Sequence, residues 1–220
     1  MVIARVADSL PGDNEPMTPF ALWLDRISGV TTTTAVWGLL LTGAIIYLVA
    51  EWRLRLLALF GQYFFIGVLF TRVFVDRPEM SLLKVLVGWL ICGALFLSAR
   101  IRQSSSERPR FHWSADLPFR ALSLVMMTVV AYLASQRYTL PFVPQDLALG
   151  CIMLVVLALL FIGTEEDSGV VGVGVLNLLA ALDVFYSAQD PGLVVTGLLV
   201  MVNLLVGLAI SYLTVVEVEA

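Results

Sequence analysis

Residues 192–214 read GLVVTGLLVMVNLLVGLAISYLT, an unbroken run without a charged side chain. A helix crosses the hydrocarbon core of a bilayer with about 20 consecutive apolar residues. The run is continuously apolar and lacks the alternation, over segments of about ten residues, that marks the strands of membrane barrels. It is therefore predicted to form a transmembrane α-helix.

The composition extends this interpretation to the whole chain. Of the 220 residues, 60% are hydrophobic and 14% are charged, and the mean hydropathy is +0.94. Soluble domains average about 45–50% apolar and about 25% charged residues. Six further apolar runs predict spans, so that seven helices would use about 140 residues. We therefore predict an all-α, polytopic membrane protein with spans at 34–50, 54–74, 80–99, 119–136, 145–163, 169–187 and 192–214.

Two polar regions flank the first group of spans. Residues 1–33 are expected to form an arm that ends in an interfacial helix, because Thr18-Pro19 is a helix start signal and apolar residues recur at helical spacing over 20–27. A disordered tail is the alternative for this region. Residues 100–118 form a polar connection with three successive serines and Pro109. This connection separates a unit at 34–99 from the remainder of the chain.

Several function classes are excluded by residue counts. A single histidine, His112, and two cysteines, Cys92 and Cys151, cannot supply a bis-histidine haem, an iron–sulfur cluster or a conventional zinc site. We expect no cofactor, and both cysteines are interpreted as packing residues. The net charge of −4 argues against a nucleic-acid partner. No basic segment with a cleavage site opens the chain, so removal of a signal peptide is not expected.

Arginines predict the orientation in the membrane. Short connections rich in Lys and Arg stay on the cytoplasmic side. The 100–120 connection and the first hairpin carry seven arginines, against five on the opposite side: Arg53, Arg55, Arg100, Arg102, Arg108, Arg110 and Arg120 against Arg5, Arg26, Arg72, Arg77 and Arg137. The chain is therefore expected in the inner (plasma) membrane of the cell, with its N-terminus outside and its C-terminus in the cytoplasm.

The chain contains an apparent internal repeat. Residues 84–88 (KVLVG) resemble residues 203–207 (NLLVG), and similar proline turns precede them at 76–78 and 189–191. Spans one to three and spans five to seven are therefore predicted to be two parallel three-helix repeats, at 34–99 and 145–215, joined by the helix at 119–136. The alternative is chance similarity, because apolar helices resemble each other easily.

Three amide side chains are predicted near the middle of the membrane. Gln62 lies nine residues beyond Arg53, and Asn177 lies nine beyond Ser168, which in each case is about 14 Å along a helix from the residue before the span. Asn203 occupies the centre of the last span. An unpaired amide in lipid costs several kcal/mol, so these side chains should face protein or water. They either join helices by hydrogen bonds or line a hydrated polar axis.

Lys84 and Asp183 are the only ionisable residues at least one helical turn inside a predicted span. Three interpretations stay open: Lys84 extends outward to the interface, Asp183 is solvated near the outer end of its helix, or either residue takes part in a proton relay. The acidic cluster at 165–167, followed by Ser168, is predicted to cap the next helix.

The second repeat resembles a known family. Residues 188–192 (AQDPG) and 203–209 (NLLVGLA) are similar to the K subunit of respiratory complex I and to the C subunit of Mrp-type cation/proton antiporters. In the K subunit two intramembrane glutamates transfer protons, and the resemblance places them at Asn177 and Asn203. This is a departure from the family, because an amide does not take up and release a proton near pH 7.

The longer, seven-helix form resembles the E-type membrane subunit of formate-hydrogenlyase-class hydrogenases. In this comparison Gln62 and the segment at 84–86 align with comparable residues, and the resemblance covers about residues 34–215. It implies a small, non-catalytic membrane subunit of a multisubunit ion-translocating complex. The implied partners are larger antiporter-like subunits and other small membrane subunits within the lipid bilayer.

Two other functions stay open at this point. The chain is either a stand-alone small transporter built on the repeat, or a purely structural assembly subunit, which the replacement of both glutamates favours. In all three cases the candidate functional residues are the polar residues predicted inside the membrane: Gln62, Lys84, Asn177, Asp183 and Asn203.

Overall fold

A computed structural model describes residues 19–49, 51–73, 78–105, 117–138, 143–164, 167–189 and 192–216. This part of the chain is all-helical and forms α1 (Pro19–Leu48), α2 (Trp52–Val73), α3 (Pro78–Ser105), α4 (Leu117–Arg137), α5 (Gln145–Thr164), α6 (Ser168–Gln189) and α7 (Leu193–Val216). The helices α2 to α7 are each long and apolar enough to cross a membrane, and α1 contains a shorter apolar segment, Thr34–Leu48. The prediction of an all-α, polytopic membrane protein is confirmed.

Two helices, α1 and α3, extend far beyond the predicted spans. The segment 20–27 does not form a separate helix, because α1 continues without a break from Pro19 into the membrane. Proline suits the first helical position, and no later proline interrupts α1. At its far end α3 extends beyond residue 99 to Ser105, since arginine and glutamine there are good helix formers. Residues 1–18 and 106–116 lie outside the described part of the chain.

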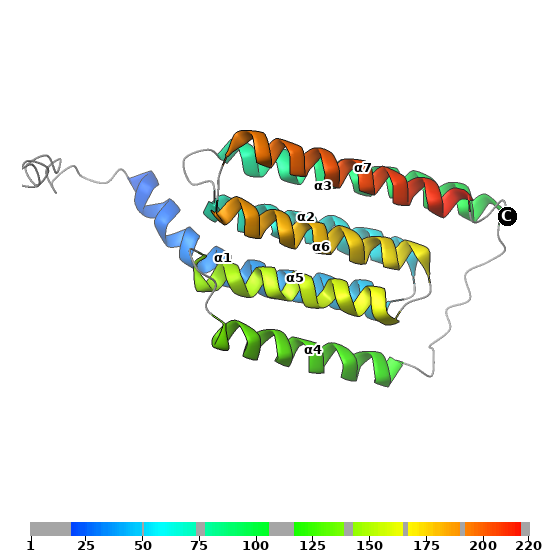
Figure 1. The fold of residues 1–220 in the computed structure, drawn as a ribbon, viewed down its shortest axis with the longest axis horizontal. Helices are drawn as coiled ribbons and strands as arrows, with labels where there is room; N and C mark the ends of the chain where they lie inside the picture. Colours follow the sequence, from blue (N-terminus) through cyan, green and yellow to red (C-terminus); the bar gives the residue numbers. More distant parts are fainter. Residues whose placement is uncertain are drawn as a thin grey trace, which may run out of the picture.

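The helices form two layers of three (Figure 1). One layer is α1–α2–α3 and the other is α5–α6–α7, and helices of the same rank are neighbours: α1 with α5, α2 with α6 and α3 with α7. The colour gradients in Figure 1 show that helices of the same rank also run in the same direction. The two layers are therefore related by a translation, without inversion across the membrane. The linking helix α4 lies at the edge, against α5 and α1.

The core lies between the two layers. Its largest fully buried side chains include Tyr47, Phe70 and Phe161. Glycines allow close helix approach: a Cβ at Gly174 of α6 would lie 3.0 Å from the Ala158 carbonyl oxygen of α5. Large apolar side chains cover the outer surfaces, as expected for helices in lipid. Only 11% of the α4 span is buried, so this helix is peripheral.

Candidate functional site

Lys84 of α3 and Asp183 of α6 form a buried ion pair. The two residues are 7% and 3% exposed. Their helices are not direct neighbours: α2, α3, α7 and α6 contact one another in that order around a ring, and the ion pair crosses its diagonal. The pair therefore joins the two layers through the centre of this α2/α3/α6/α7 group.

Further groups surround this ion pair. The Ser187 hydroxyl, one turn along α6, donates a hydrogen bond to Asp183 Oδ1 at 3.5 Å. Lys84 Nζ lies 4.9 Å from the centroid of the Phe70 ring of α2, which is a cation–π distance. Three helices thus contribute side chains to the ammonium and carboxylate. Lys84 does not extend outward to the interface, and Asp183 is buried away from solvent. The structure therefore excludes the interpretations of an outward-extending Lys84 and of a solvated Asp183.

Asn203 of α7 lies deeper in the same four-helix group, beside the Tyr63 hydroxyl of α2. The Tyr63 ring packs on α3, since a Cβ at Gly88 would come within 2.3 Å of Tyr63 Cδ1. Within the described residues, neither the Tyr63 hydroxyl nor Asn203 Oδ1 has a partner in hydrogen-bonding geometry. Buried polar atoms normally do have one, and these two groups lie close enough to interact with each other.

Gln62 faces a different set of helices. It lies seven residues after Arg55 and seven before Leu69, so the three side chains share one face of α2. Arg55 contacts Asp167 at the start of α6. Leu69 fills the space beside Gly150 of α5, where a Cβ would lie 2.9 Å from Leu69 Cδ1. Gln62 therefore points between α5 and α6, into the α1/α2/α5/α6 group.

Asn177 approaches the same group from α6. It lies three residues after Gly174, which contacts α5. It also lies four residues after Val173, which lines a cavity together with Leu59 of α2. Asn177 thus points between α2 and α5 at the depth of Gln62. Both residues are at most 2% exposed. In the described part of the chain, Gln62 Nε2, Gln62 Oε1 and Asn177 Nδ2 have no hydrogen-bond partner.

A cavity of about 110 Å³ lies between the layers at the end where α2 and α6 begin, called the inner end after the predicted orientation. Leu59 and Val173 line it, one turn from Gln62 and Asn177. The cavity is large enough for water molecules. It therefore brings a space that can hold water to within one helical turn of the buried amides.

Arg55 and Asp167 lie at the mouth of this cavity. Arg55 Nη1 is 3.5 Å from Asp167 Oδ2, and Arg55 Nε donates to the Val49 carbonyl oxygen at 2.6 Å. One guanidinium thus connects the α1–α2 and α5–α6 turns. Asp167 Oδ1 also accepts from the Gly169 amide at 3.2 Å, which confirms helix capping for this member of the acidic cluster. Residues 165 and 166 lie outside the described residues.

The five predicted polar residues therefore separate into two groups. Lys84, Asp183 and Asn203 lie in the α2/α3/α6/α7 group, and Gln62 and Asn177 face the neighbouring group. Sequence reasoning missed Tyr63 and Ser187, which are adjacent to Asn203 and Asp183. Ser187 was detectable, because it lies one helical turn beyond Asp183 on the same face.

Both cysteines are buried and free, in agreement with a packing role. Among the described residues, no three His, Cys, Asp or Glu side chains gather as a metal site would require.

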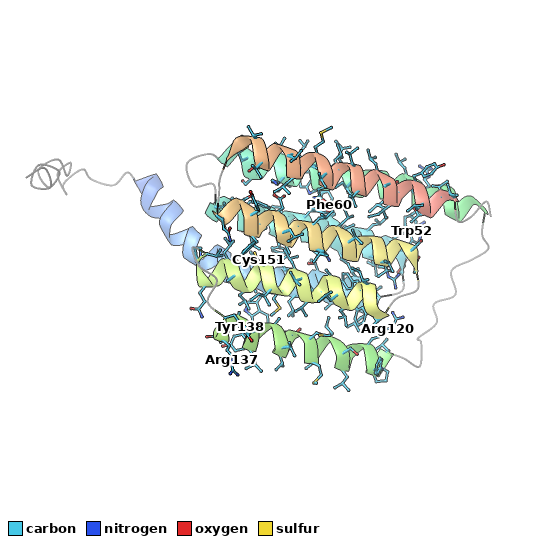
Figure 2. All side chains as sticks on the ribbon, viewed as in Figure 1. Trp52, Phe60, Arg120, Arg137, Tyr138 and Cys151 are labelled. Carbon is cyan, nitrogen blue, oxygen red and sulfur yellow. The ribbon has the colours of Figure 1, made fainter. Side chains whose placement is uncertain are left out.

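Figure 2 shows Cys151 within the bundle and Arg137 with Tyr138 near the end of α4. Arg120 near the other end of α4 donates to the Tyr47 carbonyl oxygen at 3.3 Å, which ties α4 to α1.

The fold and the polar interior define an integral, multi-pass, α-helical membrane protein. Comparisons with known protein families, with curated proteins and with solved structures found no match for this chain. The resemblance to complex I and antiporter subunits stays a prediction from the sequence.

Proposed function

We propose that this protein is a small membrane subunit of an ion-translocating complex, of the complex I, group 4 hydrogenase or Mrp-antiporter kind, in which the Lys84–Asp183 pair relays protons. The observation that carries the proposal is the position of this pair, buried at the centre of the α2/α3/α6/α7 group. The sequence resemblance supports the assignment to a complex.

The energetics of the pair favour a functional role over a purely structural one. Removing two charges from water costs several kcal/mol per ion, and a hydrophobic pair of similar volume is often as stable or more stable. Ionisable residues inside membrane helices are rare and typically mark ion pathways. Joining the two layers through Lys84 and Asp183 therefore costs free energy, and apolar side chains already hold these layers together.

The chemistry available to the pair is proton exchange. One proton can pass from the Lys84 ammonium to the Asp183 carboxylate, which leaves an amine and a carboxylic acid and removes both charges. The Ser187 hydroxyl can stabilise either form by hydrogen bonding. Asn203 and Tyr63 can orient water but do not change charge near pH 7. Lys84 and Asp183 are thus the relay residues, and the two neighbours are positioning residues.

A paired substitution tests the proposal. A single change that removes one charge leaves the other buried, which costs about 3–5 kcal/mol and can prevent folding. The double variant Lys84→Met with Asp183→Leu removes both charges and keeps an apolar filling. We expect near-normal protein yield, with proton and sodium flux of sealed membrane vesicles under an imposed gradient reduced by about tenfold or more.

The matched control is Ser98→Ala with Ser211→Ala. These hydroxyls form a buried polar contact between α3 and α7 that carries no charge. The control should keep its flux. Normal flux in the Lys84/Asp183 double variant would overturn the proposal and leave a structural assembly subunit. Ion transport by the purified chain alone in liposomes would instead favour the stand-alone transporter.

A further inference from the structure

The outward face of α2 and α3, on the side away from the second layer, carries a groove of about 470 Å³. The rings of Phe60 and Trp89 stack on each other, with centroids 4.6 Å apart, and form one wall of it, and Phe96 lies further along α3. Its floor is open at Gly93, where an added Cβ would meet no atom within 4 Å. The lining is apolar apart from Arg53.

Arginines mark the inner end of this groove. Arg53 lines it at the start of α2 and lies with its guanidinium carbon 5.6 Å from the Trp52 ring. Contact between the Trp52 and Phe96 rings, with centroids 5.7 Å apart, places the start of α2 level with Phe96. Arg100 follows Phe96 by four residues, on the same face of α3. Both arginines are exposed.

We infer that this groove is a binding site for one anionic phospholipid. The acyl chain would lie over Gly93, beside the Phe60–Trp89 stack, and the phosphate would bind Arg53 and Arg100. Basic residues at the ends of membrane helices attract anionic headgroups, and guanidinium groups bind phosphate oxygens with well-defined geometry. Trp52 and Phe60 both belong to α2, one of the two helices that carry the groove.

The dimensions and charge favour a lipid over a protein helix. A helix with its side chains is about 10–12 Å across, whereas this hollow is bounded by side chains of only two adjacent helices and deepens where one side chain is missing. Among the described residues, neither Arg53 nor Arg100 takes part in an ion pair. An apolar hollow ending at two such cations matches an acyl chain with an anionic headgroup.

Native mass spectrometry of the purified full chain tests this site. The protein is released from mixed micelles with dioleoyl-phosphatidylglycerol or dioleoyl-phosphatidylcholine, and the fraction carrying one lipid is measured. We expect a single strongly retained phosphatidylglycerol and weaker retention of phosphatidylcholine. Replacing Arg53→Gln and Arg100→Gln together should weaken phosphatidylglycerol binding by about tenfold or more.

Filling the groove is the second arm of this experiment. Gly93→Leu places a side chain in open space on the floor and should abolish the retained lipid without disturbing the fold. Gly197→Leu is the matched control, because Gly197 on α7 also has no neighbour within 4 Å of an added Cβ. Arg137→Gln, at the exposed end of α4, is the control for lost charge.

The outcomes separate the possible occupants. Equal retention of the two lipids, or unchanged binding in Gly93→Leu, would overturn the inference. Loss of a copurifying subunit in Gly93→Leu, with lipid binding intact, would assign the groove to a partner helix and equally overturn it. Because the readout is lipid retention, none of these results depends on ion flux.

Discussion

At the scale of single residues, the most unusual feature is the unmatched hydrogen-bonding capacity of Gln62 and Asn177. Three of their amide atoms lack a partner in the described part of the chain. A buried polar group left unsatisfied costs about 1–3 kcal/mol. The nearby cavity is large enough for water and has Arg55 and Asp167 among its lining residues, and water that reached the amides from it would satisfy these atoms.

Paired substitutions at Asn177 distinguish a hydrated interior from a dry one. In a hydrated interior, Asn177→Leu should impair ion flux more than protein yield, whereas Asn177→Glu should be tolerated because water solvates the carboxylate. In a dry interior, leucine would remove an amide whose Nδ2 has no hydrogen-bond partner and should cost little stability, while glutamate would place a charge in a low dielectric. We expect the first pattern, measured as yield and vesicle flux.

A control for direct amide pairing is Gln62→Leu combined with Asn177→Leu. If the two amides serve only to bond each other, the double variant will be as stable as either single variant, which a double-mutant cycle measures. Normal flux in Asn177→Leu together with lost assembly in Asn177→Glu would reduce both residues to a structural contact.

The candidate residues were predictable from the sequence, but their partners were not. Lys84 and Asp183 were identified because they are ionisable and lie inside apolar runs, and their shared depth follows from counting residues. Their pairing depends on which two helices lie opposite each other across the four-helix group. The sequences of two apolar helices carry no signal that specifies this arrangement. The separation of Gln62 and Asn177 from the ion pair has the same origin.

At the scale of helices, glycine positions determine how closely α5 and α6 pack. A Cβ at Gly174 would lie 2.8 Å from Ile162 Cγ1, 3.1 Å from Phe161 Cβ and 3.0 Å from a backbone oxygen of α5. Backbone atoms cannot move aside as a flexible side chain can. The small size of residue 174 is therefore required by the packing.

Gly174→Ala should destabilise the protein by about 1–3 kcal/mol, since overpacking forces backbone shifts. Lower thermal stability in detergent, measured as Tm, would show this. Gly163→Ala is the control on α5, because a Cβ there meets nothing within 4 Å. That variant should keep or raise the Tm, since alanine favours helix over glycine by about 1 kcal/mol. An equal Tm for both variants would contradict the assigned packing.

Helix existence was well predicted, and helix ends less so. Apolar runs gave α4 and α5 within two residues at each end. The errors lie where helices leave the membrane: hydropathy marks the end of the apolar core at residue 99, while the hydrogen-bonding backbone of α3 continues in water to Ser105. Hydropathy indicates whether a segment lies in lipid or in water, whereas the length of a helix depends on the helix propensity of its residues.

At the scale of the molecule, the orientation is predicted by arginine distribution. Ser105 ends α3, beyond the span Met80–Arg100, and should face the cytoplasm, whereas Asn14 should lie outside. In sealed cells an impermeant maleimide should label Asn14→Cys directly and Ser105→Cys only after permeabilisation. Cys92 and Cys151 are buried, so their background should be low. Labelling of Ser105→Cys from outside would reverse the orientation.

The translational stacking of the two layers has a consequence for how accessibility can alternate. In transporters with inverted repeats, the halves can exchange conformations, and an opening toward one face of the membrane becomes an opening toward the other. Here helices of equal rank run in the same direction, so exchanging the two halves would reproduce an opening on the same face. An opening toward the opposite face would therefore need a conformation that exchanging the two halves does not supply, such as a rocking of one layer against the other.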